Sequence, residues 1–540
     1  MTKRKTRRDE TPIAGDDAWW RRAVIYELYP RSFQDSDGDG IGDLQGIIDR
    51  LDYLEWLGID AVWITPIYPS PMADFGYDVA DYTGIHPLFG DFSVFDRLVA
   101  KLHARNIRLI LDFVPNHTSD RHPWFLDAKG SRDARRRDWF IWRDPAPDGG
   151  PPNNWVSIAG GDAWTFDETT GQYFCHFFLK EQPDLNWRTP DVREAMYDAM
   201  RFWFERGVDG FRLDVCWLLI KDERFRSDPL NPDFREGQPD FRKVLPLFSA
   251  DRPEILEIMA EMRGVAEEFG EDRALIGEIY LPPEKLVAYY GEDGRGLHLP
   301  FNFNLMWQAW NPAAILAYIR KYESALPPQG WPSWVLGNHD QKRIASRVGA
   351  AQARVAMLIL LTLRGTPTLY YGDELGLENV AIAPGQGQDP FGHAHPDQGR
   401  DPVRTPMPWR PEAGAGFTEG GPWLPIGEDN ARRNVEAQRD DPTSILHLTR
   451  RLLALRRAEP ALSIGAWRAV MIEGEALAYA READGRRLII IANLDTSTKT
   501  VRVDEADGGR VILSTVDGDR QRTLGPSFTL RGDEAVIVRT

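Results

Sequence analysis

Strand-like and helix-like segments alternate along most of this chain, and this alternation limits the possible folds more than any other feature. Apolar runs of strand length occupy residues 23–29, 58–66 and 107–115. Segments with helical spacing of apolar residues, 47–57 and 95–105, lie between them. Such alternation predicts the α/β class, with a parallel sheet covered by helices. Further strand candidates follow at residues 207–215, 273–279, 297–303, 334–338 and 366–371.

Eight strands of this kind fit a closed (β/α)8 TIM barrel, in which the loops after the strands build the active site. An open doubly wound sheet is the alternative, but no Gly-x-Gly-x-x-Gly dinucleotide fingerprint follows the first strand. We expect the barrel to span residues 19–115 and 189–463. Two long strand-to-helix loops are predicted within it, at 217–253 and 376–430.

Three segments depart from the alternation. Residues 116–188 are rich in Pro, Gly, Asp and Trp, which predicts a subdomain inserted after the third strand. Residues 464–540 carry short β-rich runs separated by turns such as Asp484-Gly485, which predicts a C-terminal antiparallel β domain of sandwich type. Residues 1–18 are charged and lack the apolar core of a signal peptide, so we expect a disordered tail.

Composition excludes several classes of partner. The 540 residues carry a formal net charge of −17, which argues against nucleic acid and anionic membranes. Two cysteines, Cys175 and Cys216, cannot provide a disulfide framework. No apolar run is long enough to span a bilayer. We therefore expect a cytoplasmic protein, monomeric or homodimeric.

Carboxylates end several of the strand-like segments. Arg212 and Asp214 are two residues apart, so on a strand they share one face. A buried structural ion pair would explain this stretch alone, but Glu278 and Asp340 end two further segments. A barrel strand that aims a carboxylate inward at its carboxyl end is a typical place for a catalytic group.

This set of residues suits the cleavage of a glycosidic bond. Retaining hydrolysis requires one carboxylate nucleophile and one protonated carboxyl that acts as an acid. Arg212 would lower the pKa of Asp214 and keep it ionised. Burial beside another carboxylate would keep Glu278 protonated. Asp340 could hold sugar hydroxyls.

An acidic loop at residues 35–43 (Asp-Ser-Asp-Gly-Asp-Gly-Ile-Gly-Asp) offers oxygen ligands at alternating positions, which suits Ca²⁺ or Mg²⁺. The loop is not an EF-hand, because its twelfth position is Gly46 instead of a bidentate Glu. A solvated acidic turn is the alternative. We predict a structural cation here.

Six segments resemble signature regions of the α-amylase superfamily, glycoside hydrolase family 13: residues 112–117, 182–186, 210–215, 277–279, 337–340 and 365–374. The resemblance extends from Trp20 to the C-terminal β domain. It is closer still to the oligo-1,6-glucosidase and α-glucosidase branch, on the basis of residues 35–43, 74–78 and 399–409.

This resemblance implies roles for individual residues. Asp214 would be the nucleophile, Glu278 the acid/base and Asp340 the stabiliser of the transition state. Asp74 and Arg400 would clamp the 4-hydroxyl of the terminal glucose and close the site into a pocket. Other implied substrate-binding residues are Tyr77, His117, Phe178, Gln182, Arg212 and His339, with Arg404 near the leaving group. The implied metal ligands are Asp35, Asp37, Asp39, the Ile41 carbonyl and Asp43.

The resemblance therefore implies an exo-acting, retaining α-glucosidase for short maltose- or isomaltose-type oligosaccharides, with transglucosylation as a side reaction. A glucosyl-transferring or sugar-isomerising enzyme is the alternative, although the Arg-Leu-Asp-Arg-Asp motif of sucrose isomerases is absent. Non-catalytic transporter subunits share the fold, but they lack the full carboxylate set that is present here. Val215, directly after the nucleophile, favours α-1,6 bonds by the same resemblance.

Overall fold

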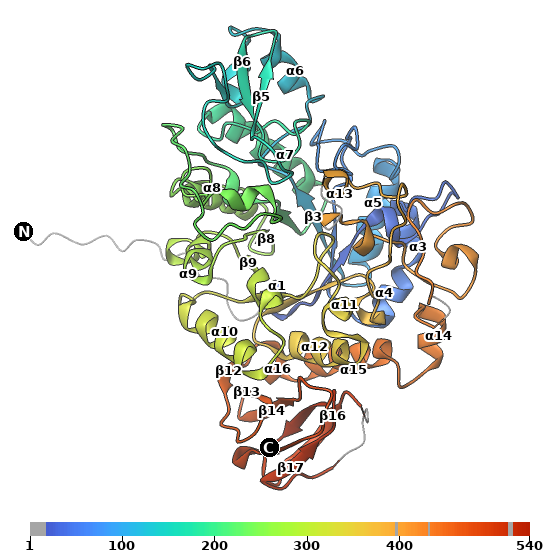
Figure 1. Cartoon of the computed structure of the whole chain (residues 1–540). Coiled ribbons are helices and arrows are strands. Elements are labelled where there is room, and N and C mark those ends of the chain that lie inside the picture. The colour runs from blue at the N-terminus through green and yellow to red at the C-terminus, as the bar shows by residue number, and fades with distance from the viewer. Residues whose placement is uncertain (1–17, 395–397, 430–431, 517–521) are drawn as a thin grey trace, which may run out of the picture.

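Eight short, parallel strands close into a barrel in the computed structural model, which describes residues 18–394, 398–429, 432–516 and 522–540 (Figure 1). Nearly every strand residue is buried on both faces, as expected for strands enclosed by helices. The order around the barrel is β1-β11-β10-β9-β8-β7-β3-β2. The strands are β1 (Ile25–Leu28), β2 (Ala61–Ile64), β3 (Arg108–Phe113), β7 (Gly210–Leu213), β8 (Ala274–Gly277), β9 (Leu299–Asn302), β10 (Ser333–Val335) and β11 (Thr366–Tyr370). Closure confirms the predicted TIM barrel over the open sheet.

Helices surround the barrel, and several begin at side chains that cap them. Asp91 accepts a hydrogen bond from the backbone of Val94 at the start of α5, and Asn311 does the same for Ala314 at the start of α10. These helices are α3 (Leu44–Asp49), α4 (Leu51–Leu57), α5 (Phe92–His103), α7 (Pro190–Glu205), α8 (Ile255–Glu267), α9 (Pro283–Leu286), α10 (Pro312–Ala325), α11 (Ile344–Val348), α12 (Ala350–Thr362) and α15 (Ile445–Ala458).

The helix expected at 47–57 is divided between α3 and α4. The chain leaves helical geometry at Arg50, whose side chain donates to Gln34 and to the carbonyl of Gly416. The remaining helices are short: α1 (Trp19–Arg22), α2 (Pro30–Phe33), α6 (Pro123–Gly130), α13 (Pro390–Ala394), α14 (Val435–Asp440) and α16 (Pro460–Ser463). Within the described ranges, no helix has the length and apolar character needed to cross a membrane.

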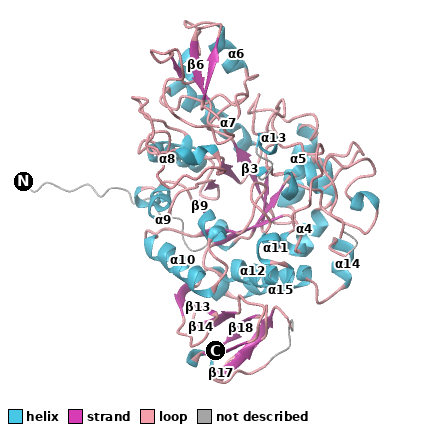
Figure 2. Cartoon of the chain, viewed as in Figure 1, coloured by secondary structure: helices cyan, strands magenta, loops and turns pink. Residues whose placement is uncertain are grey.

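A small subdomain lies between β3 and α7 and projects from the barrel (Figure 2). It contains α6 and a three-stranded antiparallel sheet in the order β4-β6-β5. The strands are β4 (Trp142–Arg143), β5 (Trp164–Asp167) and β6 (Gln172–Cys175). An isolated bridge between His117 and Asp184 joins the two ends of the insert, so its residues return to the carboxyl end of the barrel.

The C-terminal domain has a five-stranded antiparallel sheet (β12-β13-β14-β18-β16) and a two-stranded sheet (β15-β17). Alternate side chains of β14 face opposite ways: Ile489 and Ile491 join the core of this domain, whereas Leu488 and Ile490 join the barrel core. The strands are β12 (Ala466–Ala469), β13 (Leu477–Ala483), β14 (Arg486–Ala492), β15 (Lys499–Arg502), β16 (Arg510–Ser514), β17 (Ser527–Leu530) and β18 (Ala535–Arg539). The predicted antiparallel domain is confirmed.

The hairpin between β13 and β14 turns at Asp484 and Gly485, whose φ angles of 51° and 72° are those of the expected two-residue turn. In Figure 1 this domain lies beneath α10, α12, α15 and α16, which separate it from the barrel. The tail expected at residues 1–18 falls, except for Ala18, outside the described residues.

Candidate active site

The polar residues predicted for the site lie at the carboxyl ends of adjacent barrel strands. Asp112 is near the end of β3, and it pairs in register with Arg212 of β7. Strands β7 and β8 also pair in register. Asp214 and Glu278, each the first residue after its strand, therefore lie side by side. This end of the barrel is where enzymes of this architecture place their chemistry.

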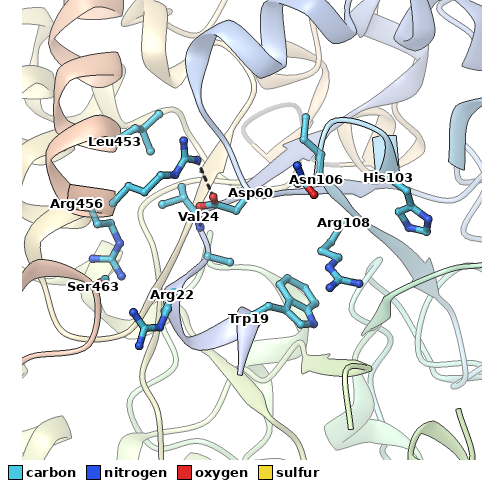
Figure 3. Close-up of a pocket in the computed structure, with 13 residues that line it drawn as sticks. Trp19, Arg22, Val24, Asp60, His103, Asn106, Arg108, Leu453, Arg456 and Ser463 are labelled. Atoms are coloured by element: carbon cyan, nitrogen blue, oxygen red, sulfur yellow. Dashed lines mark hydrogen bonds and ion pairs between the residues drawn. The ribbon is translucent and has the colours of Figure 1, made fainter. Parts of the chain in front are cut away.

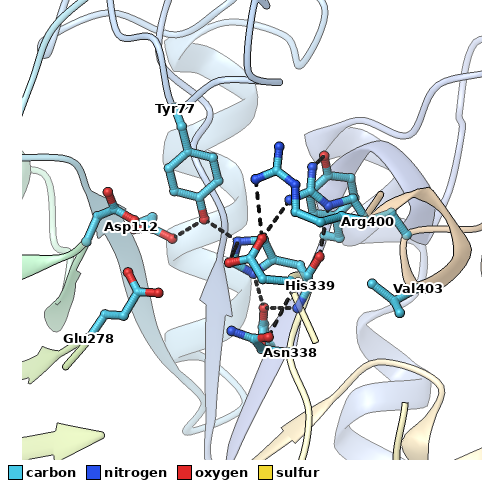
Figure 4. A network of polar contacts seen from close by, with 12 residues as sticks. Tyr77, Asp112, Glu278, Asn338, His339, Arg400 and Val403 are labelled. Atoms are coloured by element: carbon cyan, nitrogen blue, oxygen red, sulfur yellow. Dashed lines mark hydrogen bonds and ion pairs between the residues drawn. The ribbon is translucent and has the colours of Figure 1, made fainter. Parts of the chain in front are cut away.

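Arg212 is the centre of this cluster. Its Nη1 lies 2.8 Å from Oδ1 of Asp112 and 2.7 Å from Oδ1 of Asp214, and its Nη2 lies 2.7 Å from Oε2 of Glu278. The Arg212 side chain is fully buried. One fixed cation therefore offsets the charge of three buried carboxyl groups, which would otherwise be costly to desolvate. Figure 4 shows Asp112 and Glu278 on the same side of the site.

Asp214 and Glu278 both contact the Arg212 guanidinium. Burial raises the pKa of Asp214 well above its usual range, Arg212 opposes this effect, and the negative charge of Glu278 adds to it. Arg212 thus lowers the pKa of Asp214 in the direction that the sequence predicts, but burial has the larger effect, so the pKa of Asp214 in the unliganded site stays raised.

The backbone directly after Asp214 is strained and supports Glu278. Val215 has φ 34° and ψ 40°, in the left-handed region that branched residues avoid. In this conformation its N–H donates to Oε2 of Glu278 at 2.9 Å. The buried Cys216 thiol donates to the Glu278 carbonyl at 3.5 Å. Residues 215 and 216 therefore anchor both the carboxyl group and the backbone of Glu278. Strained backbone of this kind is typical of functional sites.

Asp340 lies on the opposite side of the site, after β10. Its Oδ1 is 2.8 Å from Arg404 and 3.5 Å from Arg400, and its Oδ2 is 3.3 Å from Nε2 of His339. Burial opposes ionisation, but His339, Arg404 and Arg400 hold the pKa of Asp340 well below its usual range. Asp340 is therefore a carboxylate. Arg404 is fully buried and donates to the His339 carbonyl at 2.9 Å, so it lies behind Asp340 and away from solvent.

Arg400 forms a second charged contact, with the loop after β2. Its Nη2 lies 2.5 Å from Oδ1 of Asp74 and 2.6 Å from Oδ1 of Asp389. Asp389 also accepts the backbone N–H of Arg400. Arg400 thus forms two buried ion pairs, with Asp74 and with Asp389, and the contact with Asp389 fixes the guanidinium that contacts Asp74.

The inserted subdomain supplies the remaining wall. Gln182 donates to Oδ2 of Asp74 at 3.3 Å and lies 3.1 Å from Nε2 of His117. The ring of Phe178 is 5.0 Å from the ring of His117. Burial lowers the pKa of His117 to about 3, so this imidazole is neutral. Together with Tyr77, these side chains give one polar, partly aromatic wall of the kind that binds a sugar.

Comparisons with known proteins agree with this geometry. Residues 27–465 match the family model described as the α-amylase catalytic domain. The chain belongs to the α-amylase family.

Two curated relatives of this α-amylase-family chain match it along nearly their full lengths. A probable α-glucosidase from Rhizobium meliloti is 41% identical, over 96% of this chain and 97% of the relative. An oligo-1,6-glucosidase from Heyndrickxia coagulans is 38% identical, over 96% and 99%. Among solved structures, the α-glucosyl transfer enzyme XgtA matches with a TM-score of 0.91 and 38% identity, over 97% of this chain and 99% of that one.

Three residues at this α-amylase-family site receive no role from the sequence. Asp112 belongs to a signature segment, but its contacts with Arg212 and Tyr77 appear only in the fold. Glu27 is a charged residue within an otherwise apolar strand segment, a signal that sequence reasoning could have used. Asp389 lies in a Gly- and Pro-rich loop with no local pattern that marks it.

The acidic loop brings together three of the five expected metal ligands. Carboxylate oxygens of Asp35, Asp37 and Asp39 lie within 4.8 Å of one another. Asp43 is used differently: it accepts from Ser36 and caps α3 through the N–H of Gly46. The three carboxylates fit a hard divalent cation, which prefers oxygen ligands.

A separate cavity of about 540 Å³ lies at the other end of the barrel (Figure 3). Its lining includes Val24, Asp60 and Arg108, at the amino ends of β1, β2 and β3. Asp60 forms an ion pair with Arg457 at 2.7 Å, and Arg108 forms one with Asp209 at 2.9 Å. In α-amylase-type barrels, as in other TIM barrels, this end serves stability, and the reaction takes place at the opposite end.

Proposed function

We propose that this enzyme is an exo-acting, retaining α-glucosidase that releases glucose from the non-reducing end of short α-glucosides of the maltose and isomaltose type. The observation that carries the proposal is that Asp214 and Glu278 contact one guanidinium, that of Arg212, beside an ionised Asp340. The relatives named α-glucosidase and oligo-1,6-glucosidase support this substrate class.

The two carboxyl groups divide the chemistry between them. Asp214 attacks the anomeric carbon while Glu278 gives its proton to the departing glycosidic oxygen. Water then cleaves the glucosyl ester, with Glu278 acting as the base. Asp214 contacts Nη1 and Glu278 contacts Nη2 of the same guanidinium, which supports the short separation of about 5–5.5 Å between the carboxyl groups that retention requires. The first step requires an ionised Asp214 and a protonated Glu278.

Asp340 and its neighbours stabilise the transition state. Its carboxylate is fixed by Arg404 and Arg400, so it offers a preorganised negative charge to the oxocarbenium-like sugar. Arg404 acts through Asp340, because its guanidinium is buried behind that carboxylate. This contact favours a positioning role for Arg404 over direct contact with the leaving group.

The contact between Asp74 and Arg400 supports action at chain ends. Both groups would bind the 4-hydroxyl of the terminal glucose, and their ion pair would close the pocket beyond that sugar. Asp389 holds Arg400 in place. The other contacts to the glucose would come from residues of the same pocket: Tyr77, His117, Phe178, Gln182, Arg212 and His339.

Transfer of glucose to an acceptor other than water is the second candidate. It is favoured by the strong structural match to a solved α-glucosyl transfer enzyme. The same Asp214 ester would serve both outcomes, so transfer is expected as a side reaction whose share grows with the acceptor concentration.

Further properties are proposed on narrower grounds. A structural Ca²⁺ or Mg²⁺ would bind Asp35, Asp37 and Asp39, and the Ile41 carbonyl could complete the site; the ion would order the loop and take no part in the reaction. A cytoplasmic location is supported by two buried, unpaired cysteines. A monomeric or homodimeric state stays a prediction.

Hydrolysis followed by proton NMR tests the proposed function. Maltose, isomaltose, sucrose, trehalose and maltotriose would be supplied separately, and the anomer of the first-formed glucose recorded. We expect α-glucose first, and glucosyl-acceptor products at high sugar concentration. Initial β-glucose would overturn the retaining mechanism, and a preference for internal bonds of longer chains would overturn the exo assignment.

A further inference from the structure

Glu27, a fully buried residue of β1, contacts the active-site residue His339 through a single oxygen. Its Oε1 accepts the backbone N–H of His339 at 3.2 Å and lies 2.6 Å from the ring Nδ1. The second oxygen, Oε2, is buried and makes no hydrogen bond within the described residues. A buried carboxyl with one oxygen unsatisfied is costly, so its presence here calls for an explanation.

The other ring nitrogen of His339 faces two oxygens. Nε2 lies 2.7 Å from Oη of Tyr77 and 3.3 Å from Oδ2 of Asp340. Tyr77 also contacts Oδ2 of Asp112, at 2.9 Å, and Figure 4 shows this chain of contacts from Asp112 through Tyr77 to His339. The ring cannot turn easily, because Tyr77 and Tyr29 stack on it at centroid distances of 5.4 and 6.0 Å.

The hydrogens available for these contacts place one on Nε2 of His339. Asp340 is a carboxylate and can only accept. Tyr77 has a single hydroxyl hydrogen, which Asp112 can accept. If Nε2 carried no hydrogen, its lone pair would face Asp340, and Tyr77 would have to turn its hydrogen away from Asp112. With a hydrogen on Nε2, Tyr77 and Asp340 both face that one N–H, Tyr77 donates to Asp112, and no two acceptors face each other without a hydrogen.

The contact between Glu27 and Nδ1 must then contain one hydrogen as well. Either the carboxyl group is protonated and donates to a neutral ring, or a carboxylate accepts from an imidazolium. Burial raises the pKa of Glu27 well above its usual range and lowers the pKa of His339 well below its own, which favours the first form. In both forms the hydrogen on Nε2 is retained.

We propose that Glu27 is a positioning residue that shares one proton with Nδ1 of His339 and thereby keeps a hydrogen on Nε2, on the edge of the ring that faces Tyr77 and Asp340 in the glucose pocket. The inference rests on the proposed function, because this ring would contact the bound glucose. An Nε2–H donor can hold a sugar hydroxyl while Asp340 accepts from the sugar. The ionisable groups that face this pair are Tyr29, Tyr77, Asp112, Arg212, Asp340, Tyr370, Arg400 and Arg404.

The isosteric variant Glu27→Gln separates this role from packing. In the variant, the backbone N–H of His339 still needs an acceptor at the place of the Glu27 Oε1 atom. The carbonyl oxygen of the new amide side chain therefore takes that place. It cannot donate to Nδ1, and a neutral ring would carry its hydrogen on Nδ1 and none on Nε2. Only at lower pH, where the ring gains a second proton, would the Nε2 donor return.

We expect kcat/KM of Glu27→Gln on p-nitrophenyl α-glucoside to fall about tenfold at the alkaline end of the profile. This loss should become smaller at acid pH, so the alkaline limb of the plot of kcat/KM against pH moves to lower pH. This substrate needs little protonation of its leaving group, so the limb does not report the state of Glu278. The control is Tyr26→Phe, which removes a hydrogen bond of 2.7 Å to Glu374 from the same strand and should leave the limb in place.

A loss of equal size at every pH would overturn the proposal, because packing alone would explain it. Neutron diffraction of the deuterium-exchanged wild type gives a second test that does not depend on the variant folding. We expect one deuteron on Nε2 of His339 and one between Nδ1 and Oε1 of Glu27; an Nε2 without a deuteron would overturn the proposal. If wild-type protein fails to cleave any α-glucoside, the proposed function fails, while the neutron result still decides the state of His339.

Discussion

At the scale of single residues, the role of Glu278 as the acid can be tested by substituting it, because the loss of activity should depend on the leaving group of the substrate. Glu278→Gln keeps the side-chain shape but removes the proton donor, so kcat/KM on maltose should fall about 10²–10⁴-fold. On an activated aryl glucoside the loss should be much smaller, since that leaving group departs without protonation. Asp214→Asn provides the contrast, because it should abolish cleavage of both substrates. Equal losses for Glu278→Gln on both substrates would assign the acid to another group.

Val215 is the residue at which linkage preference should be tested. It is buried and follows Asp214 in a strained backbone conformation, where the proposed function would place the edge of the site for the second sugar. We expect measurable cleavage of isomaltose by the wild type and a shift towards maltose in Val215→Thr. A change of this size in a pocket is worth about 1–3 kcal/mol, so a preference and not an absolute rule should change. A wild type that cleaves maltose and leaves isomaltose intact would assign linkage to the neighbouring loops.

At the scale of elements, the acidic loop should respond to chelator as a stability element. Asp35 accepts hydrogen bonds from the N–H groups of Gly38 and Gly40 and from the hydroxyl of Thr418, so the loop is tied to a segment nearly 400 residues away. A bound cation would strengthen this link by mass action. Chelator should therefore lower the melting temperature and leave low-temperature activity largely intact. In Asp39→Asn that effect should be reduced, whereas immediate loss of kcat without a change in melting would indicate a catalytic metal.

The sequence predicts the elements better than it predicts the contacts between them. All eight barrel strands are recognisable, because buried parallel strands are apolar on both faces and end at polar residues. The division of helix 47–57 at Arg50 depends on contacts with Gln34 and Gly416, which local spacing does not reveal. The same applies to Asp389, which meets Arg400 only in the folded chain. Likewise, the sequence places Arg212 beside Asp214, but the burial that raises the pKa of Asp214 appears only when the strands meet in the barrel.

At the scale of the whole molecule, the stability of the fold should decrease as the pH rises through the neutral range. Burial raises the pKa of Asp78 and Asp112 to about 6 and that of Asp373 to about 7. In an unfolded chain these groups titrate near pH 4. Between about pH 4 and 7 these three groups therefore hold more protons in the native state than in the unfolded state, so their contribution to the free energy of unfolding falls with increasing pH. The net charge of −17 adds repulsion in the same direction.

Thermal melting at a series of pH values between about 6.5 and 8 checks this prediction, with ionic strength held constant. Buried histidines act in the opposite direction at lower pH: the pKa of His117 is lowered to about 3 and that of His122 to about 4, so below about pH 6.5 the unfolded chain holds more protons at these residues. The depressed pKa of Asp340 also acts in the opposite direction, but only in strong acid. We therefore expect the highest melting temperature near the acid end of this series. Asp373→Asn removes one of the titrating groups and should flatten the decline at neutral pH. A melting temperature that rises steadily from about pH 6.5 to 8, or a variant with an unchanged slope, would show that these buried carboxyl groups do not govern the pH dependence.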